Sequence, residues 1–273
     1  MSDTFVRVNT LNIHLQSAGK GKPLVLIHGF MGMAFDWRFN ITELGKHFSV
    51  FAMDLPGFGL SDKPLDFDYS SKGYADFITS FIDVLNVHKV ALIGNSMGGQ
   101  IALMTALEYP GCVSELVLVD SGGYPQSVEF KPFKMLNIPV IGEISMALLN
   151  RNIIRIMLRE GIYYDASIVT DEIVRTYSSV YDTPNARKIP PLVIRSIMKD
   201  ESYIASRLNE IKCPALVIWG AEDKVISPTR ADMFRQDISQ ASLLLVQKSG
   251  HMPQVEKPDV VNKAIIQFLS ART

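Results

Sequence analysis

The stretch Lys89-Val-Ala-Leu-Ile-Gly-Asn-Ser-Met-Gly-Gly-Gln100 decides the fold. Residues 90–93 form an unbroken aliphatic run, which predicts a strand covered on both faces. The next residues fit the pattern Gly-x-Ser-x-Gly, in which the glycines let the chain turn sharply from a strand into a helix. We expect that helix over residues 97–109, before Pro110-Gly111. Ser96 is therefore predicted at the apex of the turn, as a candidate nucleophile.

Outward from this turn, short apolar strands alternate with helical patterns, which predicts a mainly parallel α/β sheet with helices on both faces. An antiparallel hairpin is expected over 5–16, around Asn9-Thr10. The strands expected after it are 24–27, 49–54, 90–93, 113–119, 215–219 and 242–246, and the helices are 35–47, 70–86, 97–109, 229–236 and 259–271. In such a sheet, ligands bind at the carboxyl ends of the strands, where Ser96 lies.

The alternation stops between residues 122 and 207, where helical patterns at about 139–160, 170–182 and 191–208 follow one another without a strand. We interpret residues 122–207 as a helical cap inserted into a core formed by residues 1–121 and 208–273. Apolar side chains in the cap should line part of a substrate pocket, although helical spacing alone does not distinguish them from packing residues.

Composition excludes several classes of function. The 273 residues are 47% hydrophobic and 20% charged with a formal net charge of −1, and no basic run is present, so we expect no nucleic-acid partner. No secretory signal and no membrane span is visible, so the default location is the cytoplasm. Cys112 and Cys213 lack the spacing of metal ligands and are interpreted as small hydrophobic residues near strand starts.

A serine nucleophile needs a base and a group that orients the base. Of the five histidines, only His251 lies in a loop after a late core strand, so it is the candidate base. Asp223 and Asp120 both follow predicted strands and compete as the orienting acid. The chain order Ser, Asp, His favours Asp223, and Asp120 is expected to bind backbone groups of the 121–123 turn. Glu222 is interpreted as a solvated loop residue.

Acyl transfer also needs donors for the oxyanion of the tetrahedral intermediate. The backbone N–H of Met97, directly after the nucleophile, begins a helix and is free to donate. A second N–H is expected from Phe30, which follows His28-Gly29 at the end of a strand. The His28 imidazole itself is expected to pack or hydrogen-bond beneath this loop.

Taken together, these motifs resemble the α/β-hydrolase fold superfamily, in the capped branch that includes esterases, lactonases, cofactor-free haloperoxidases and carbon–carbon bond hydrolases. The resemblance covers essentially the whole chain. It rests on His28-Gly29-Phe30, Asp54-Leu-Pro-Gly-Phe-Gly-Leu-Ser-Asp62, Gly94-Asn-Ser-Met-Gly-Gly99, Trp219-Gly-Ala-Glu-Asp223 and Gly250-His251. It implies an eight-stranded sheet, a Ser-His-Asp triad and no metal or organic cofactor.

Within this branch, the elbow, the Asp120-Ser-Gly-Gly turn and cap residues 164–172 are similar to hydrolases of ring-cleaved aromatic diketone acids. The chain departs from them after His28-Gly29, where Phe30-Met-Gly-Met33 replaces Gly-Pro-Gly, and after His251, where Met252 stands instead of tryptophan. Arg195 is a candidate ligand for a substrate carboxylate but fits a helix surface better. Dehalogenases and epoxide hydrolases are disfavoured because they would need aspartate at position 96.

The favoured hypothesis is a carboxylesterase-like serine hydrolase that cleaves a carboxylic ester, or a related carbonyl compound, through an acyl-enzyme. Its partner is a small, largely apolar carbonyl substrate. Two alternatives stay open: a carbon–carbon bond hydrolase, and a non-catalytic receptor that uses the same fold to hold a small ligand. The oligomeric state is not indicated by the sequence.

Overall fold

The computed structural model describes residues 2–125 and 128–271. Residues 1, 126, 127, 272 and 273, which fall within the predicted core and cap, lie outside the described residues. The predicted eight-stranded sheet is confirmed, with the strand order β1-β2-β4-β3-β5-β6-β7-β8. The strands are β1 (Ser2–Val8), β2 (Leu11–Ala18), β3 (Pro23–Ile27), β4 (Ser49–Met53), β5 (Val90–Asn95), β6 (Val113–Val119), β7 (Ala215–Gly220) and β8 (Ala241–Val246). All pairs are parallel except β1 with β2 and β2 with β4.

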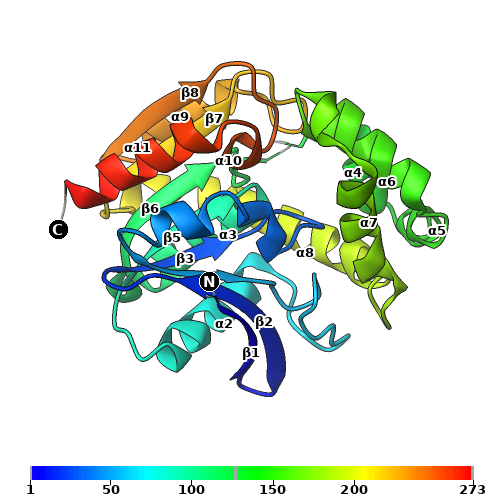
Figure 1. Cartoon of the computed structure of the whole chain (residues 1–273), viewed down its shortest axis with the longest axis horizontal. Coiled ribbons are helices and arrows are strands. Elements are labelled where there is room, and N and C mark those ends of the chain that lie inside the picture. Colours follow the sequence, from blue (N-terminus) through cyan, green and yellow to red (C-terminus); the bar gives the residue numbers. More distant parts are fainter. Residues whose placement is uncertain (1, 126–127, 272–273) are drawn as a thin grey trace.

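Helices cover both faces of the sheet, as predicted (Figure 1). Alternate residues of the central strands point to opposite faces. In β3, Val25 and Ile27 join the core beneath α2 (Ser71–Val84), α3 (Met97–Glu108) and α9 (Thr229–Asp237), whereas Leu24 and Leu26 join the core beneath α1 (Ile41–Leu44) and α11 (Pro258–Ser270). Burial on both sides explains why these strands read as continuous apolar runs.

The helix predicted over 35–47 is wrong as a continuous element. The chain forms a short 3-10 turn, Ala34–Trp37, and then the single turn α1. Asn40 lies between them with its side chain buried, and its Nδ2 donates to Oδ1 of Asn262 in α11 at 2.8 Å. This tertiary contact fixes the interruption, which the apolar periodicity of the segment does not indicate.

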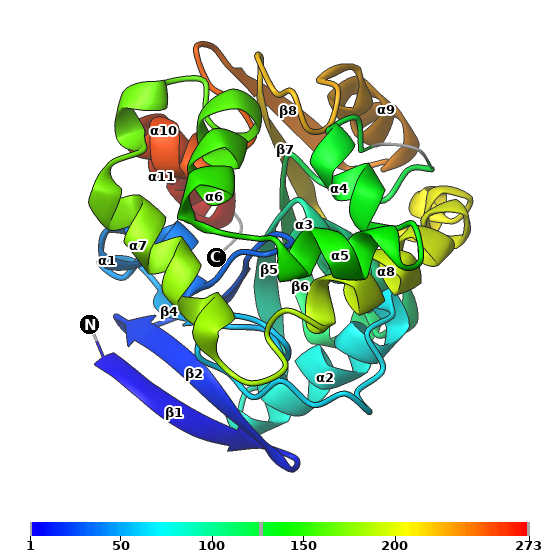
Figure 2. The same ribbon diagram turned by 90° about the vertical axis from the view of Figure 1, so that its right-hand side faces the viewer.

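Between β6 and β7 the described residues contain helices and only one isolated bridge, between Val128 and Ile226. The helix predicted over 139–160 begins only after Val140, which has a φ of 70°, and it is divided because Asn150 starts a new helix by accepting from the N–H groups of Asn152 and Ile153. The α-helices of this part are α4 (Lys131–Leu136), α5 (Ile141–Ala147), α6 (Arg151–Met157), α7 (Asp171–Ser179) and α8 (Ile189–Ala205). They lie over the carboxyl ends of the strands (Figures 1 and 2). The cap boundaries at 122 and 207 remain predictions.

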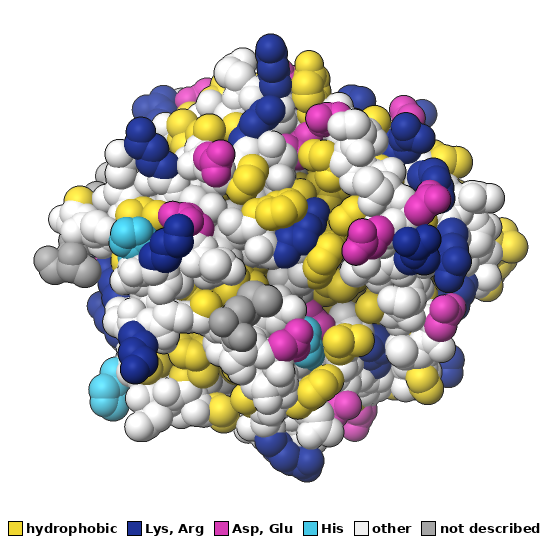
Figure 3. Space-filling view, viewed as in Figure 1, with side chains coloured by type: hydrophobic (Ala, Val, Ile, Leu, Met, Phe, Trp, Pro, Cys, Tyr) yellow, Lys and Arg dark blue, Asp and Glu magenta, His cyan; other side chains and the backbone are white. Residues whose placement is uncertain are grey.

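Acidic and basic side chains are interspersed over the face drawn in Figure 3. Among the described residues, no helix combines the length and the hydrophobicity needed to cross a bilayer.

Candidate active site

The turn after β5 holds Ser96 in a strained backbone conformation, with φ 54° and ψ −116°. Such a conformation is rare for a residue with a side chain and is typical of a nucleophile at the apex of a strand-to-helix turn. A Cβ on Gly94 would lie 2.2 Å from the carbonyl oxygen of Gly98, and one on Gly98 would lie 2.3 Å from that of Ile27. Both glycines are therefore required by close backbone approach, as the sequence pattern indicates.

His251 and Asp223 come together behind this turn. Nδ1 of His251 and Oδ2 of Asp223 are 2.8 Å apart, and both side chains are buried. The other carboxylate oxygen of Asp223 accepts from the N–H groups of Val225 and Ile226 at 2.7 and 3.1 Å. Asp223 is thus fixed by its own loop and holds Nδ1 of His251 as a donor, which leaves Nε2 as the free nitrogen.

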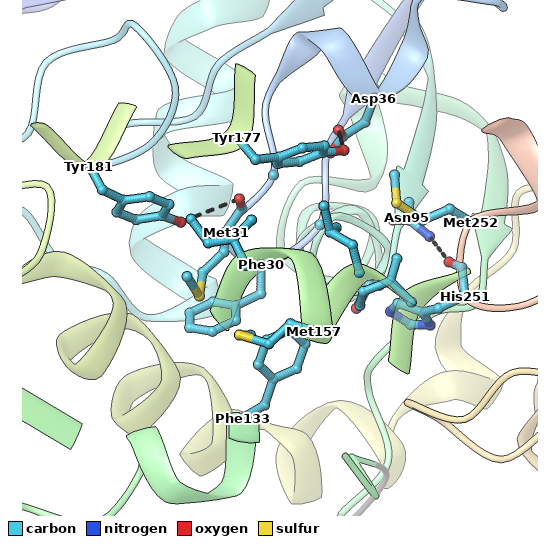
Figure 4. A pocket seen from close by; sticks show the side chains of 16 residues that line it. Phe30, Met31, Asp36, Asn95, Phe133, Met157, Tyr177, Tyr181, His251 and Met252 are labelled. Atoms are coloured by element: carbon cyan, nitrogen blue, oxygen red, sulfur yellow. Dashed lines mark hydrogen bonds between the residues drawn. The ribbon is translucent and has the colours of Figure 1, made fainter. Parts of the chain in front are cut away.

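Ser96 and His251 line the same cavity, next to Met252 (Figure 4). Among the described residues, the Ser96 hydroxyl makes no hydrogen bond, and it is not closed off from the cavity. Catalytic hydrogen bonds are often long without substrate. The structure therefore brings together the predicted nucleophile and the predicted base.

The two predicted oxyanion donors are on the same cavity system. Phe30 lines the cavity beside Ser96, and Met97 is the first residue of α3. Within the described part of the chain, neither backbone N–H donates a hydrogen bond. Both amides thus remain available to a ligand atom, and their role in catalysis stays a prediction.

His28 stabilises the loop that carries Phe30. Its Nδ1 donates to the carbonyl oxygen of Gly29 at 2.7 Å, and its Nε2 accepts from the N–H of Leu55 at 2.9 Å. The imidazole is fully buried and has both nitrogens occupied, so it joins two loops beneath the site, as expected.

Two residues that the sequence reasoning missed hold the histidine loop. Nδ2 of Asn95, in the elbow, donates to the carbonyl oxygen of His251 at 3.1 Å (Figure 4). Glu256 accepts from the N–H of Gly250 at 2.6 Å through one oxygen, and from those of Tyr164 and Asp165 at 2.9 and 3.0 Å through the other. Asn95 was visible only as a polar residue in a buried strand, and no sequence pattern marks Glu256.

Asp120 was expected to bind backbone groups of the 121–123 turn, and this expectation is wrong. Its Oδ1 accepts from the N–H of Gly220, at the end of β7, at 2.8 Å, and not from the 121–123 turn. The reason is topological, because β6 and β7 are neighbours and Asp120 follows the end of β6. Burial, and then the charge of Asp223, raise the pKa of Asp120 well above its ordinary value.

Glu222 also differs from the expectation of a solvated residue. Its Oε2 accepts from the N–H of Ser249 at 2.9 Å, and its own N–H donates to the Ser249 carbonyl. It therefore ties the loop of Asp223 to the loop of His251.

Hollows lie on both sides of Ser96. Ser96, Phe30 and Phe133 line both of them, and the two phenyl rings meet edge to face with centroids 5.3 Å apart. The first hollow continues to Met157, Tyr177 and Tyr181, and the second to Gln100, Ile194, Ile197 and Met198. Of the apolar cap residues between 130 and 163, Met135 has an exposed side chain, whereas five line the site: Phe133, Ile154, Met157, Leu158 and Ile162.

One acidic side chain reaches the first hollow. Asp36 is buried, accepts from the Tyr177 hydroxyl and accepts from the N–H of Met33 at 3.2 Å (Figure 4). Burial raises its pKa. Arg195, by contrast, binds Glu143 at 2.5 Å and lines neither hollow, but its side chain is only 22% exposed and its Nη1 is buried without a hydrogen-bond partner among the described residues, so it is not a simple helix-surface residue.

Three relatives put this site in context. The chain is 28% identical over 269 residues to the uncharacterised hydrolase YugF of Bacillus subtilis, covering 96% of this chain and 94% of the relative. It is 29% identical to a 2-hydroxy-6-oxononadienedioate/2-hydroxy-6-oxononatrienedioate hydrolase of Comamonas testosteroni, with 97% and 96% covered. A meta-cleavage product hydrolase of Pseudomonas fluorescens superposes with a TM-score of 0.85 at 25% identity, over 99% of this chain and 98% of that one. Residues 24–264 match the α/β hydrolase family, and the predicted superfamily is therefore confirmed: the chain belongs to the α/β hydrolase family.

Proposed function

We propose that this α/β hydrolase is a carboxylesterase-like serine hydrolase that cleaves a carboxylic ester or a related carbonyl substrate. The observation that carries the proposal is the position of His251, whose Nδ1 is bound to Asp223 while its ring lines the cavity of Ser96. This arrangement leaves Nε2 of His251 free to accept a proton, in a ring that shares its cavity with Ser96, whose backbone is held in a strained turn.

In the proposed reaction, Nε2 of His251 takes the Ser96 proton while Ser96 Oγ attacks the carbonyl carbon. The amides of Phe30 and Met97 stabilise the oxyanion. The tetrahedral intermediate collapses as His251 returns the proton to the leaving alcohol, and an acyl-enzyme remains. Water, deprotonated by the same imidazole, then releases the acid. No step requires a metal or an organic cofactor.

Membership of the family implies a small-molecule substrate. The two hollows beside Ser96 would take the acyl part and the alcohol part, one on each side of the reacting carbonyl. Their walls are mainly aromatic and aliphatic, from Phe30, Phe133, Met157 and Ile197. We therefore propose a largely apolar substrate, with residues 122–207 acting as the cap that forms much of its pocket.

Labelling with a fluorophosphonate probe tests the nucleophile. The parent protein should react and Ser96→Ala should not, while Ser114→Ala, at a serine far from the elbow in the sequence, should react like the parent. Turnover of short p-nitrophenyl esters that is lost in His251→Ala supports the enzyme. An intact protein that does not react with the probe contradicts the proposal, and tight ligand binding without turnover favours the receptor alternative.

A second candidate is hydrolysis of a carbon–carbon bond in ring-cleaved aromatic diketone acids. It is favoured by the names of relatives such as the hydrolase of Comamonas testosteroni. Those substrates carry carboxylates, yet the charged side chain that lines the first hollow is Asp36, and Arg195 is bound to Glu143 outside it. We therefore rank the ester reaction first. Comparing kcat/KM for an ester, a lactone and a vinylogous diketone acid separates the two reactions.

A further inference from the structure

Large apolar side chains are exposed on the outside of the predicted cap. Six of the sixteen large hydrophobic residues that are exposed in the described chain fall within residues 135–148, with exposed fractions of 41–67%. We call these six the outer cap face: Met135, Ile138, Val140, Ile141, Ile144 and Leu148. A cluster of this kind on one surface is unusual for a monomer and marks an interaction site.

The outer cap face lies on helices of the predicted cap whose opposite side faces the active-site cavity. In α4, Phe133 points inward to the cavity while Met135 is exposed. In α5, Gly142 and Met146 are buried while Ile141 and Ile144 are exposed at helical spacing. Helices α4, α5 and α6 lie toward the viewer in Figure 2. These helices are therefore apolar on two sides: the inner side is buried or lines the cavity, and the outer side is exposed to solvent.

Backbone strain keeps one of these residues on the surface. Val140 joins α4 to α5 with a φ of 70°, and it is the most exposed of the six. A β-branched residue is a genuine outlier in this region, where glycine or asparagine is preferred. Such strain persists where the conformation serves a purpose, and here it presents an apolar side chain to solvent.

Basic residues outnumber acidic ones in the segment that carries the outer cap face. Residues 131–160 contain five basic side chains and two acidic ones, in a chain with a formal net charge of −1. The acidic Glu143 is already bound by Arg195, which comes from outside this segment. Lys134, Arg151 and Arg159 are exposed, and the structure gives them no ion pair with any described residue. Basic and hydrophobic side chains adjoin at the right-hand edge of Figure 3, where Figure 1 draws α5, and acidic side chains stand among them.

We infer that the outer cap face docks the protein on an anionic lipid surface. Exposed aliphatic side chains flanked by Lys and Arg are the composition that enters the boundary between headgroups and acyl chains, with the cations at the phosphates. A second copy of this chain fits less well, because a twofold contact would oppose the same basic groups. The inference goes beyond ester cleavage and is independent of it.

Co-sedimentation with phosphatidylcholine vesicles, with and without phosphatidylglycerol, tests the inference. We expect binding to the vesicles that contain phosphatidylglycerol, and weaker binding as salt screens the charges. The double variant Ile144→Asp/Leu148→Asp should weaken binding at least roughly tenfold, because it places carboxylates among the inserted side chains. Lys134→Glu/Arg151→Glu should weaken it by a similar factor.

The matched control is Val260→Asp, at a valine of α11 that is 45% exposed and belongs to the predicted core, outside the outer cap face. It should bind vesicles like the parent, and so should Ser96→Ala, which separates docking from catalysis. Far-UV circular dichroism and urea unfolding like those of the parent show that the variants fold, whatever the enzymatic activity. Binding to neither vesicle, equal binding to both, or a dimer in sedimentation velocity that Ile144→Asp/Leu148→Asp abolishes would overturn the inference.

Discussion

The carboxyl groups of Asp120 and Asp223 lie next to each other, after the ends of β6 and β7. One carboxylate oxygen of each acid and a ring nitrogen of His251 all lie within 4.8 Å of one another. Both acids are buried. Two carboxylates cannot both stay ionised at such a distance without a counter-charge. Burial and the charge of Asp223 raise the pKa of Asp120, so we expect Asp120 to be the acid that holds a proton.

Asp120→Asn should therefore have little effect on kcat, whereas Asp223→Asn should lower kcat strongly. An amide at position 120 is neutral, like the protonated acid, and can still accept from the N–H of Gly220. We expect kcat within about threefold of the parent for Asp120→Asn, and a loss of about 10⁴ for Asp223→Asn, which removes the charge that orients the imidazole. Ester kinetics across pH measure both variants. Equal losses would identify Asp120 as a second orienting acid.

His14 and Asp54 should make stability depend on pH. Nδ1 of His14 lies 2.9 Å from Oδ2 of Asp54, and this hydrogen bond, opposed by burial, raises the pKa of His14 to about 9. Because the pKa is higher in the folded state than the unfolded value of about 6.5, the stabilisation is complete below about pH 6.5 and is lost as pH rises through about 9. This contribution to the free energy of unfolding is at most roughly 3.5 kcal/mol.

Urea unfolding at a series of pH values between these limits measures this effect. In His14→Gln the same part of the profile should flatten, because no proton is then released from that position. The exposed histidine at position 47 offers a control, since His47→Gln should keep the slope of the parent. A parent profile that is flat across this range contradicts the prediction.

Local patterns made the core of this fold predictable. The strands from β3 to β7 are buried on both faces, so their apolar runs are continuous in the sequence, and the glycines of the elbow mark the sharp turn at Ser96. The order of motifs then related Ser96, Asp223 and His251. All of these signals lie within a few residues of the features that they predict.

Contacts between distant segments were not predictable in the same way. Tyr177 reaches Asp36 from 141 residues away, and Glu256 binds amides 91 and 92 residues before it. Asp120 accepts from the N–H of Gly220 because β6 and β7 are neighbours in the sheet, and the order of the strands along the chain does not determine this pairing. The helix predicted over 139–160 starts after the left-handed backbone of Val140 and is broken by the cap at Asn150, while the apolar periodicity continues through both.

Glu256 should act as a positioning residue for His251. Its carboxylate joins the N–H of Gly250, directly before His251, to the N–H groups of Tyr164 and Asp165. In Glu256→Gln one acceptor oxygen becomes an NH₂ group, so at least one of these amides loses its partner, at a cost of about 1–3 kcal/mol. We expect kcat to fall by roughly tenfold or more with little change in KM, because the imidazole is displaced.

The control for Glu256 is Glu43→Gln, at a partly exposed residue of α1 that pairs with Lys46, which should leave both constants unchanged. Urea unfolding of the two variants separates lost stability from lost positioning. Parent-like kcat in Glu256→Gln would show that the remaining contacts of the His251 loop, with Asn95, Ile162 and Glu222, keep it in place without Glu256.

Asp36 should discriminate against substrates that carry a carboxylate in the first hollow. Its pKa is raised chiefly by burial, so it ionises at a higher pH than an ordinary aspartate, and ionisation places a negative charge in the wall of the cavity. The ratio of kcat/KM for a neutral ester to that for a matched ester with a terminal carboxylate should therefore rise with pH. In Asp36→Asn this rise should disappear and the acidic ester should gain roughly tenfold relative to the neutral one. Tyr177→Phe removes the hydroxyl that donates to Asp36 but keeps the carboxyl group of Asp36. Because the hydrogen bond from Tyr177 lowers the pKa of Asp36, this variant should still discriminate against the acidic ester, but the rise of the ratio should occur at higher pH. A ratio that is the same in the parent and in Asp36→Asn at every pH would remove Asp36 from the determinants of specificity.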